Sequence, residues 1–226
     1  LGDYLTAALE RILPLLVRIP RLANLLMASA LARFFTARIA GIVDAPALDP
    51  HTAGERLRER GVPISDLEAL RKLPKDARAV VILQDAFTTF YEPNVLEAAC
   101  LLLRVLGFEP HVLPYFENGK ALHIKGFMRR FGKVVAKNSA LLREVAALGF
   151  PLVGVEPAVV LTYRDEYPKL LGEEAGFRVA LLQEWLAEQT LPVRASRDDG
   201  YRLLSHCTEQ ALVSKSPALW VKVFSA

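Results

Sequence analysis

Short apolar runs alternate with segments of helical periodicity through the middle of the chain. Five consecutive apolar residues, 79–83, predict a strand at 79–84 that is buried on both faces. Apolar positions spaced three and four apart predict a helix at 94–106, ended by Gly107. Further strands are predicted at 110–114 and 151–155, on either side of a long helix at 123–148. Strand–helix–strand order is typical of parallel βαβ units, so the predicted fold class is α/β with a parallel sheet.

The same alternation continues after residue 155. It predicts helices at 158–171 and 177–188, a loop at 196–200, a fourth strand at 201–206 and a last helix at 218–224. A strand and a helix at this point should lead to another strand. The pattern therefore indicates a second α/β unit that is begun and not completed.

An apolar N-terminal segment precedes these units. Residues 5–42 predict two packed amphipathic helices, interrupted at Pro14 and Pro20. The alternative interpretation is a helical surface that docks on a neighbouring domain or on a membrane face, because arginines are spaced along a Leu/Phe-rich stripe. Charges and prolines leave no window suited to a transmembrane helix. A connector at 43–76 contains one predicted helix, 65–71, with Ser65 as N-cap and Glu68 completing a capping box.

Composition excludes several classes of protein. The chain has 226 residues, of which 52% are apolar and 23% are charged, which is globular composition. The formal net charge of +3 is too small to indicate nucleic-acid binding. The sequence has no Gly-rich phosphate loop, no nucleophile elbow and no metal-ligand spacing among its histidines.

Polar residues follow each predicted strand. They are Gln84 and Asp85 after the first, 117–120 after the second, Glu156 and Pro157 after the third, and 206–209 after the fourth. Carboxyl ends of parallel strands meet at one sheet edge, so we expect a common site there formed by Asp85, Asn118, Lys120, Glu156, Arg164 and His206. Asp85 and Glu156 are expected to pair with Lys120 and Arg164. The alternative is that these are ordinary solvated turn residues.

The two cysteines differ in their surroundings. Cys100 lies among leucines and is interpreted as a small core residue. Cys207 follows a predicted strand between His206 and Thr208, where a thiolate could react or bind a metal. Two cysteines cannot by themselves hold a four-cysteine cluster.

Several long stretches resemble a known family. They are VVILQDAFTTFYEPNVLEAA, LGFEPHVLPYFENGKALHIKGFMRRFGKVVAKNSALL, PLVGVEPAVVLTYRDEY and HCTE. Together they resemble the C-terminal region of bacterial FAD-linked, iron–sulfur D-2-hydroxyacid dehydrogenases of the D-2-hydroxyglutarate dehydrogenase type. In that family this region looks like two cysteine-rich CCG modules. The resemblance implies a helical segment and connector at 1–76, a degenerate first module at 77–195, and the start of a truncated second module at 196–226.

The resemblance also implies where cluster ligands are missing. Gln84-Asp85 stands where a CCG module has its first cysteine, Asn118-Gly119-Lys120 stands near the double cysteine, and 156–163 replaces the last cysteines. Cys207 occupies the first-cysteine position of the second module, which makes it an expected iron–sulfur ligand in the longer protein only. No catalytic residue is expected in this chain, and the chain alone should be inactive, colourless and without FAD or cluster.

The family further implies partners and location. The longer enzyme would oxidise a D-2-hydroxy acid, such as 2-hydroxyglutarate or a lactate-like acid, and pass electrons from FAD through [4Fe–4S] centres to a quinone or carrier protein. This chain would be scaffold beside the FAD and ferredoxin-like domains, in the cytoplasm or peripheral to the inner membrane. The rival interpretation is a non-catalytic α/β interaction module or small-anion-binding module, with anion contacts from Lys120, His123, Lys125 and Arg164.

Overall fold

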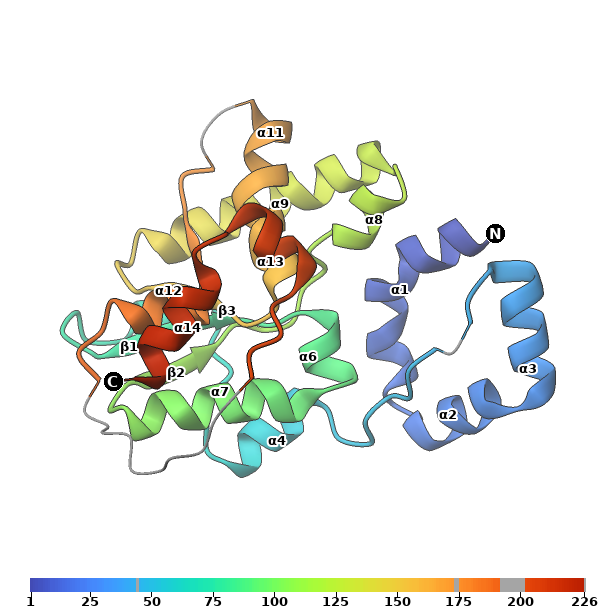
Figure 1. The fold of residues 1–226 in the computed structure, drawn as a ribbon, viewed down its shortest axis with the longest axis horizontal. Helices are drawn as coiled ribbons and strands as arrows, with labels where there is room; N and C mark the ends of the chain where they lie inside the picture. The colour runs from blue at the N-terminus through green and yellow to red at the C-terminus, as the bar shows by residue number, and fades with distance from the viewer. Residues whose placement is uncertain (44, 173–174, 192–201, 226) are drawn as a thin grey trace.

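A parallel sheet of four strands organises the described part of the chain (Figure 1). The computed structural model describes residues 1–43, 45–172, 175–191 and 202–225. Neighbouring strands are all parallel: Val81 lies opposite His111 on one side and Leu152 on the other. The predicted α/β class with parallel βαβ units is confirmed. The strands, in their order across the sheet, are β2 (Glu109–Val112), β1 (Ala79–Leu83), β3 (Leu152–Gly154) and β4 (Val179–Leu181).

Helices cover both faces of the sheet because the central strands are apolar on both sides. Val81 and Leu83 face a core shared with α9, α10 and α11, whereas Val80 and Ile82 face a core shared with α4, α7 and α12. Burying β1 completely explains its continuous apolar run. The helices are α1 (Gly2–Leu16), α2 (Pro20–Ala28), α3 (Ala30–Phe35), α4 (Ala53–Glu59), α5 (Leu67–Arg71), α6 (Ala86–Phe90), α7 (Pro93–Val105), α8 (Lys120–Ile124), α9 (Met128–Ala146), α10 (Pro157–Leu161), α11 (Tyr167–Leu171), α12 (Leu182–Ala187), α13 (Cys207–Leu212) and α14 (Ser216–Phe224), with π-helical turns η1 (Thr36–Ala40) and η2 (Thr162–Glu166).

The fourth strand lies elsewhere than predicted. Residues 202–206 are not a strand, and the side chain of Leu204 in this segment is exposed. The fourth strand is instead β4, at the start of the predicted helix 177–188, which begins only at Leu182. A three-residue strand is defined by its pairing with β3, which local periodicity does not show. The predicted loop 196–200, Tyr201 and the boundary between 195 and 196 lie outside the described residues.

Three predicted helices have different bounds or caps. The helix at 123–148 is divided into α8 and α9, because Gly126 adopts a φ of 74° between them. The helix at 158–171 forms as α10, η2 and α11 in succession. The capping box of Ser65 and Glu68 is wrong: Asp66 caps α5 by accepting the Ala69 N–H at 2.9 Å. Ser65 is buried, and its N–H donates to Val112.

The N-terminal segment forms three helices where two were predicted. Pro20 is the first residue of α2, as suits a residue without an N–H, and α3 continues into η1. A small core of Leu13, Ala23, Leu48, Ala86 and Phe90 joins α1 and α2 to α6. In Figure 1, α2 and α3 project to one side of the sheet and its covering helices.

Candidate functional site

The strand order creates a switch point between β1 and β3. The connection from β1 leads to β2 on one side, and the connection from β2 leads back to β3 on the other. In open parallel sheets ligands bind outside the carboxyl ends of the strands at such a point. Asp85 follows β1 and Glu156 follows β3, and both side chains line the same small cavity. The sequence-predicted convergence at this edge therefore occurs for these two carboxyl groups.

Both carboxyl groups cap short helices. Asp85 Oδ1 accepts N–H bonds from Phe87 at 2.7 Å and Thr88 at 3.1 Å, and Oδ2 accepts the Thr88 hydroxyl. Glu156 Oε2 accepts the Val159 N–H at 2.6 Å. The first N–H groups of a helix have no partner within the helix, so these side chains satisfy donors that would otherwise be orphaned.

Burial changes the acidity of the pair. Removal from water raises the pKa of Asp85 and the pKa of Glu156, and the charge of Asp85 raises the Glu156 pKa further. The hydrogen bonds from α6 and α10 oppose these shifts, and His206 also lowers the pKa of Glu156. Desolvation is the largest cause for both residues, so the switch point disfavours negative charge.

The space between the two carboxyl groups is almost filled. The cavity that they line measures about 10 Å³, which is about the space of one water molecule. Tyr163 also lines it, is fully buried, and has a hydroxyl without a hydrogen-bond partner among the described residues. Burial raises the pKa of Tyr163 as well. This cavity cannot accept an organic cofactor or substrate with the side chains placed as they are.

Helix α1 covers the same edge of the sheet. Its Glu10 is buried, and Glu10 Oε2 accepts the Gly119 N–H at 3.0 Å. Tyr115 Oη donates to the Glu10 carbonyl at 2.9 Å, and burial raises the pKa of the Glu10 carboxyl. Sequence reasoning missed this residue. Its signal was that Glu10 shares the three-residue spacing of Ala7 and Leu13, which both lie on the buried face of α1.

Asn118 has a structural place beside this edge. Its side-chain oxygen accepts the Lys120 N–H at 2.8 Å, and its carbonyl accepts the Tyr167 hydroxyl at 2.8 Å. Asn138 Nδ2 donates to the same hydroxyl at 3.0 Å. Gly119 follows with a φ of 82°, a conformation that favours glycine. Asn118 and two residues absent from the sequence-based site, Tyr167 and Asn138, thus fix the turn into α8.

The predicted ion pairs of Asp85 and Glu156 with Lys120 and Arg164 are wrong. Lys120 Nζ pairs with Glu166 at 2.9 Å, and Arg164 pairs with Glu184 at 2.7 Å. Carboxylates of η2 and α12 therefore neutralise both cations, and Asp85 and Glu156 receive N–H donors instead of cations.

Ion pairs within the chain also weaken the alternative interpretation of a small-anion-binding module. Lys125 pairs with Asp3 at 2.7 Å, and His123 Nδ1 lies 3.9 Å from Glu166. Each of the four residues that would contact an anion thus faces a carboxylate.

His206 and Cys207 begin α13, which packs against α10. His206 caps the helix through Nδ1, which accepts the Thr208 N–H at 3.2 Å. Glu209 accepts the His206 N–H and is held in a buried network with Gln183 and Ser216. Three members of HCTE therefore stabilise the start of α13, while Cys207 is exposed.

The two cysteines lie in different surroundings. Cys100 is buried in the α7 core, and burial raises its pKa to about 12. In the ranges that the structure describes, no three His, Cys, Asp or Glu side chains are placed to hold a metal ion. Cys207 is thus the one cysteine of the two that an external group could reach.

Replacing Asp85 with asparagine tests the cost of burying this carboxyl group. Asparagine caps helices as well as aspartate does. A raised folded-state pKa means that the folded protein keeps a proton that the unfolded chain has released, so the free energy of unfolding falls as pH rises above about 4. We expect Asp85→Asn to lose less stability than the unmodified chain between pH 4.5 and pH 7.5, measured by urea unfolding.

The matched control is Asp66→Asn at the exposed cap of α5. Because solvent reaches this side chain, its replacement removes no buried carboxyl group, and we expect a smaller effect on stability than for Asp85→Asn. Equal pH dependence for Asp85→Asn and Asp66→Asn would contradict the assignment.

The whole chain is similar to one class of enzyme. The chain is 39% identical over 231 residues to D-2-hydroxyglutarate dehydrogenase of Escherichia coli, with all of this chain and 23% of that protein covered. It is 38% identical to the enzyme of the same name from Pantoea ananatis, with all of this chain and 22% of that protein covered. The Haemophilus influenzae enzyme of that name is 34% identical over 98% of this chain and 23% of its own length.

These relatives are much longer than the chain. It spans between 22% and 23% of the length of the curated relatives described above. No protein-family model matches the chain, and no solved structure matches it. The similarity therefore supports a part of a D-2-hydroxyacid oxidoreductase, and the activity of the whole belongs to the proposal below.

Membrane-spanning potential is limited to one broken segment. Among the described residues no single helix is long and apolar enough to cross a bilayer. The pair Pro20–Ala28 and Ala30–Ile39 meets the length and composition test together, with a bend of 69°.

Proposed function

We propose that this chain is a non-catalytic part of a longer cytoplasmic D-2-hydroxyacid dehydrogenase that acts on D-2-hydroxyglutarate or a similar acid. The observation that carries the proposal is the similarity to D-2-hydroxyglutarate dehydrogenases along the entire chain. The reaction converts a D-2-hydroxy acid into a 2-oxo acid by removing two electrons and two protons. The family resemblance adds FAD as hydride acceptor and [4Fe–4S] centres that carry electrons to a quinone or carrier protein.

The geometry supports a scaffold role for this part. The switch point, where a parallel sheet would bind a ligand, is occupied by Tyr163 and by the helix-capping carboxyl groups of Asp85 and Glu156. Helix α1 covers the neighbouring turn through Glu10. The residues that replace the family's cluster ligands therefore hold helices in place, and the chain alone is expected to turn over no substrate.

The residues of this chain do not fit a complete iron–sulfur site. Such a cluster usually takes four cysteine ligands, and Cys100 is enclosed in the core. Cys207 is exposed at the first position of α13 and is the residue that we assign as one ligand of a cluster completed elsewhere in the longer protein. The other ligands would come from outside this chain.

The proposal is tested on the full-length protein that contains this chain. We expect bound flavin, iron with acid-labile sulfide, and reduction of an artificial acceptor by the D but not the L enantiomer of 2-hydroxyglutarate. Cys207→Ser should lower the iron and sulfide content by about one cluster per protein while flavin content stays unchanged. Cys100→Ser is the control, because a buried core thiol should leave iron and sulfide unchanged.

Two outcomes separate the parts of the proposal. Full-length protein without D-2-hydroxyglutarate activity would overturn the assigned function. Activity with iron content unchanged in Cys207→Ser would retain the function and overturn the role of Cys207.

A further inference from the structure

We propose that the outward surface of α2, α3 and η1 is the docking surface for another domain of the longer polypeptide, and that this domain presents an apolar patch rimmed by carboxylates. This surface, called here the N-terminal face, is formed by Leu22, Leu25, Leu26, Leu31, Phe34, Phe35 and Ile39 with Arg18, Arg21 and Arg38 at its margins. The inference rests on the proposed function, since that function supplies the longer polypeptide.

The large apolar side chains of this face point into solvent. Leu25 and Leu31 are each 69% exposed, and Phe34 is 63% exposed. Scattered exposed leucines are ordinary, but α2 exposes Leu22, Leu25 and Leu26, and α3 exposes Leu31, Phe34 and Phe35, at the three- and four-residue spacing of one helix face, which is typical of an interaction surface.

The opposite side of α2 is anchored, so the face has a fixed position. Ala23 is buried against Leu13 and Leu48. Asn24 holds the backbone of Leu48 with two hydrogen bonds of 2.8 Å, one through its nitrogen and one through its oxygen. The exposed leucines therefore lie on a helix whose other side is packed. Their exposure does not result from an unpacked helix.

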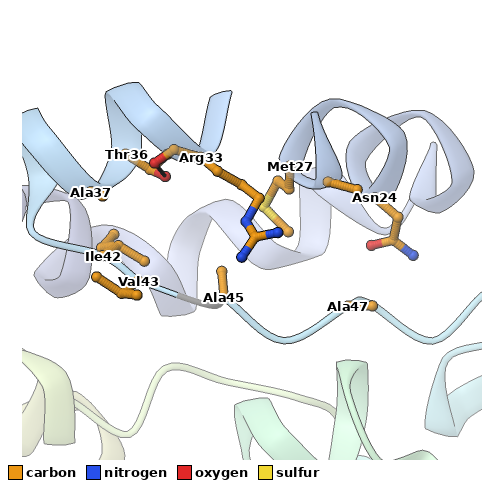
Figure 2. Close-up of a pocket in the computed structure, with 10 residues that line it drawn as sticks. Asn24, Met27, Arg33, Thr36, Ala37, Ile42, Val43, Ala45 and Ala47 are labelled. Carbon is orange, nitrogen blue, oxygen red and sulfur yellow. Dashed lines mark hydrogen bonds between the residues drawn. The ribbon is translucent and has the colours of Figure 1, made fainter. Parts of the chain in front are cut away.

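A groove beside the face offers a second contact area. It lies between α2, α3 and residues 42, 43, 45 and 47, has a volume of about 420 Å³, and is lined by Met27, Ala37, Ile42 and Val43 among others. Figure 2 shows Met27 and the guanidinium of Arg33 directed toward this segment from the two helices. A side chain of the docked domain can enter here, next to the exposed leucines.

The charged residues from Arg11 to the end of η1 have a single sign, whereas Asp44 and Asp49 follow in the connector. Arg11, Arg18, Arg21, Arg33 and Arg38 are the charged residues between 11 and 43, with no aspartate, glutamate or lysine among them. Arg11 pairs with Glu117 on the sheet side. In the described ranges no ion pair is found for Arg18, Arg21 or Arg38, which are exposed. An acidic rim on the partner would complement these three cations.

The composition favours a protein partner over a lipid surface. Arginine, methionine and aromatic residues are enriched in protein interfaces, and lysine, aspartate and glutamate are depleted there. Membrane-surface helices carry lysine or arginine opposite tryptophan, phenylalanine or leucine, and residues 11–43 share the arginine, phenylalanine and leucine but contain neither lysine nor tryptophan, so lipid vesicles are included in the test below. The relatives, of which this chain spans less than a quarter, have ample additional sequence to supply such a partner.

Side-chain labelling of the full-length protein tests the proposal. Hydroxyl radicals oxidise exposed phenylalanines, and mass spectrometry locates the product. Phe87 on α6 is 54% exposed and serves as internal reference for Phe34. We expect Phe34 to be oxidised at least five-fold more slowly than Phe87. Arg21→Glu should raise the Phe34 rate several-fold at low salt, whereas Arg58→Glu on the exposed side of α4 should not.

Each other possible occupant of the N-terminal face would give a different labelling result, and each of these results would contradict the inference. Equal labelling of Phe34 and Phe87 means that no domain covers the face. Protection that increases with protein concentration means a second copy, and protection that appears only with phosphatidylglycerol vesicles means a lipid surface. Activity on D-2-hydroxyglutarate is measured in the same sample: activity with an unprotected Phe34 overturns this inference alone, and protection without activity overturns the proposed function alone.

Discussion

Replacing Gly154 with alanine is expected to destabilise the fold by about 1–3 kcal/mol, the usual cost of overpacking a core. Gly154 ends β3 at the switch point, and a Cβ placed there would clash with Val160 Cγ2. Val160 belongs to α10 and is buried, so it cannot move away without shifting that helix. The added methyl group would also displace the cap that Glu156 forms, since Glu156 lies between Gly154 and α10.

Gly132→Ala is the matched control for this substitution. Gly132 lies within α9, and a Cβ there would meet Leu170 at an ordinary 3.6 Å. Alanine is the better helix former, so we expect Gly132→Ala to be neutral or stabilising by up to about 1 kcal/mol. Urea unfolding of both variants measures the difference. Similar midpoints for the two would mean that the switch point is not tightly packed.

Tyr167→Phe is expected to lower the free energy of unfolding by about 1–3 kcal/mol, because it leaves buried polar groups without partners. The Tyr167 hydroxyl donates to the Asn118 carbonyl and accepts from Asn138 Nδ2. Phenylalanine would fill the same space but leave the Asn118 carbonyl without this donor. Because Asn118 shapes the turn that leads to α8, we also expect proteolysis near residue 119 to become faster.

Tyr163→Phe removes a hydroxyl from the neighbouring ring and is the control. The two rings lie 5.0 Å apart between centroids, and both are buried. The Tyr163 hydroxyl has no hydrogen-bond partner among the described residues, so its removal should be neutral or slightly stabilising. Equal losses for Tyr163→Phe and Tyr167→Phe would show that a bound water or another group satisfies the Tyr163 hydroxyl.

The two carboxyl groups predicted to meet at the sheet edge do so, but their binding partners differ from the predicted ones. Asp85 and Glu156 line one cavity, as strand-end positions in a parallel sheet should. Their partners are the N–H groups of α6 and α10 and not the cations Lys120 and Arg164. A carboxylate next to a helix start finds N–H donors within two or three residues, so it needs no distant cation.

The sequence alone determined the elements whose apolar pattern is regular. The continuous apolar run of β1 and the helical spacing of α7 predict their structures because β1 is buried on both faces and α7 presents one apolar stripe to the sheet. The places of Asp85 and Glu156 followed from the alternation of strands and helices. The resemblance in VVILQDAFTTFYEPNVLEAA and the other stretches likewise needed no coordinates, and the relatives that match the whole chain are named D-2-hydroxyglutarate dehydrogenases, while the CCG modules and iron–sulfur centres stay predictions.

Tertiary structure decided what depends on contacts between distant segments. Strand β4 exists because Val179–Leu181 pairs with β3, whereas the apolar residues at 203–204 find no such partner and are exposed. Glu10 hydrogen-bonds to Gly119, which is more than a hundred residues away in the sequence. Lys120 and Arg164 form ion pairs with Glu166 and Glu184 and not with the carboxyl groups of the predicted site. Spacing within a sequence reports which face of an element is apolar, but the choice between competing partners is made only when packing brings those faces together.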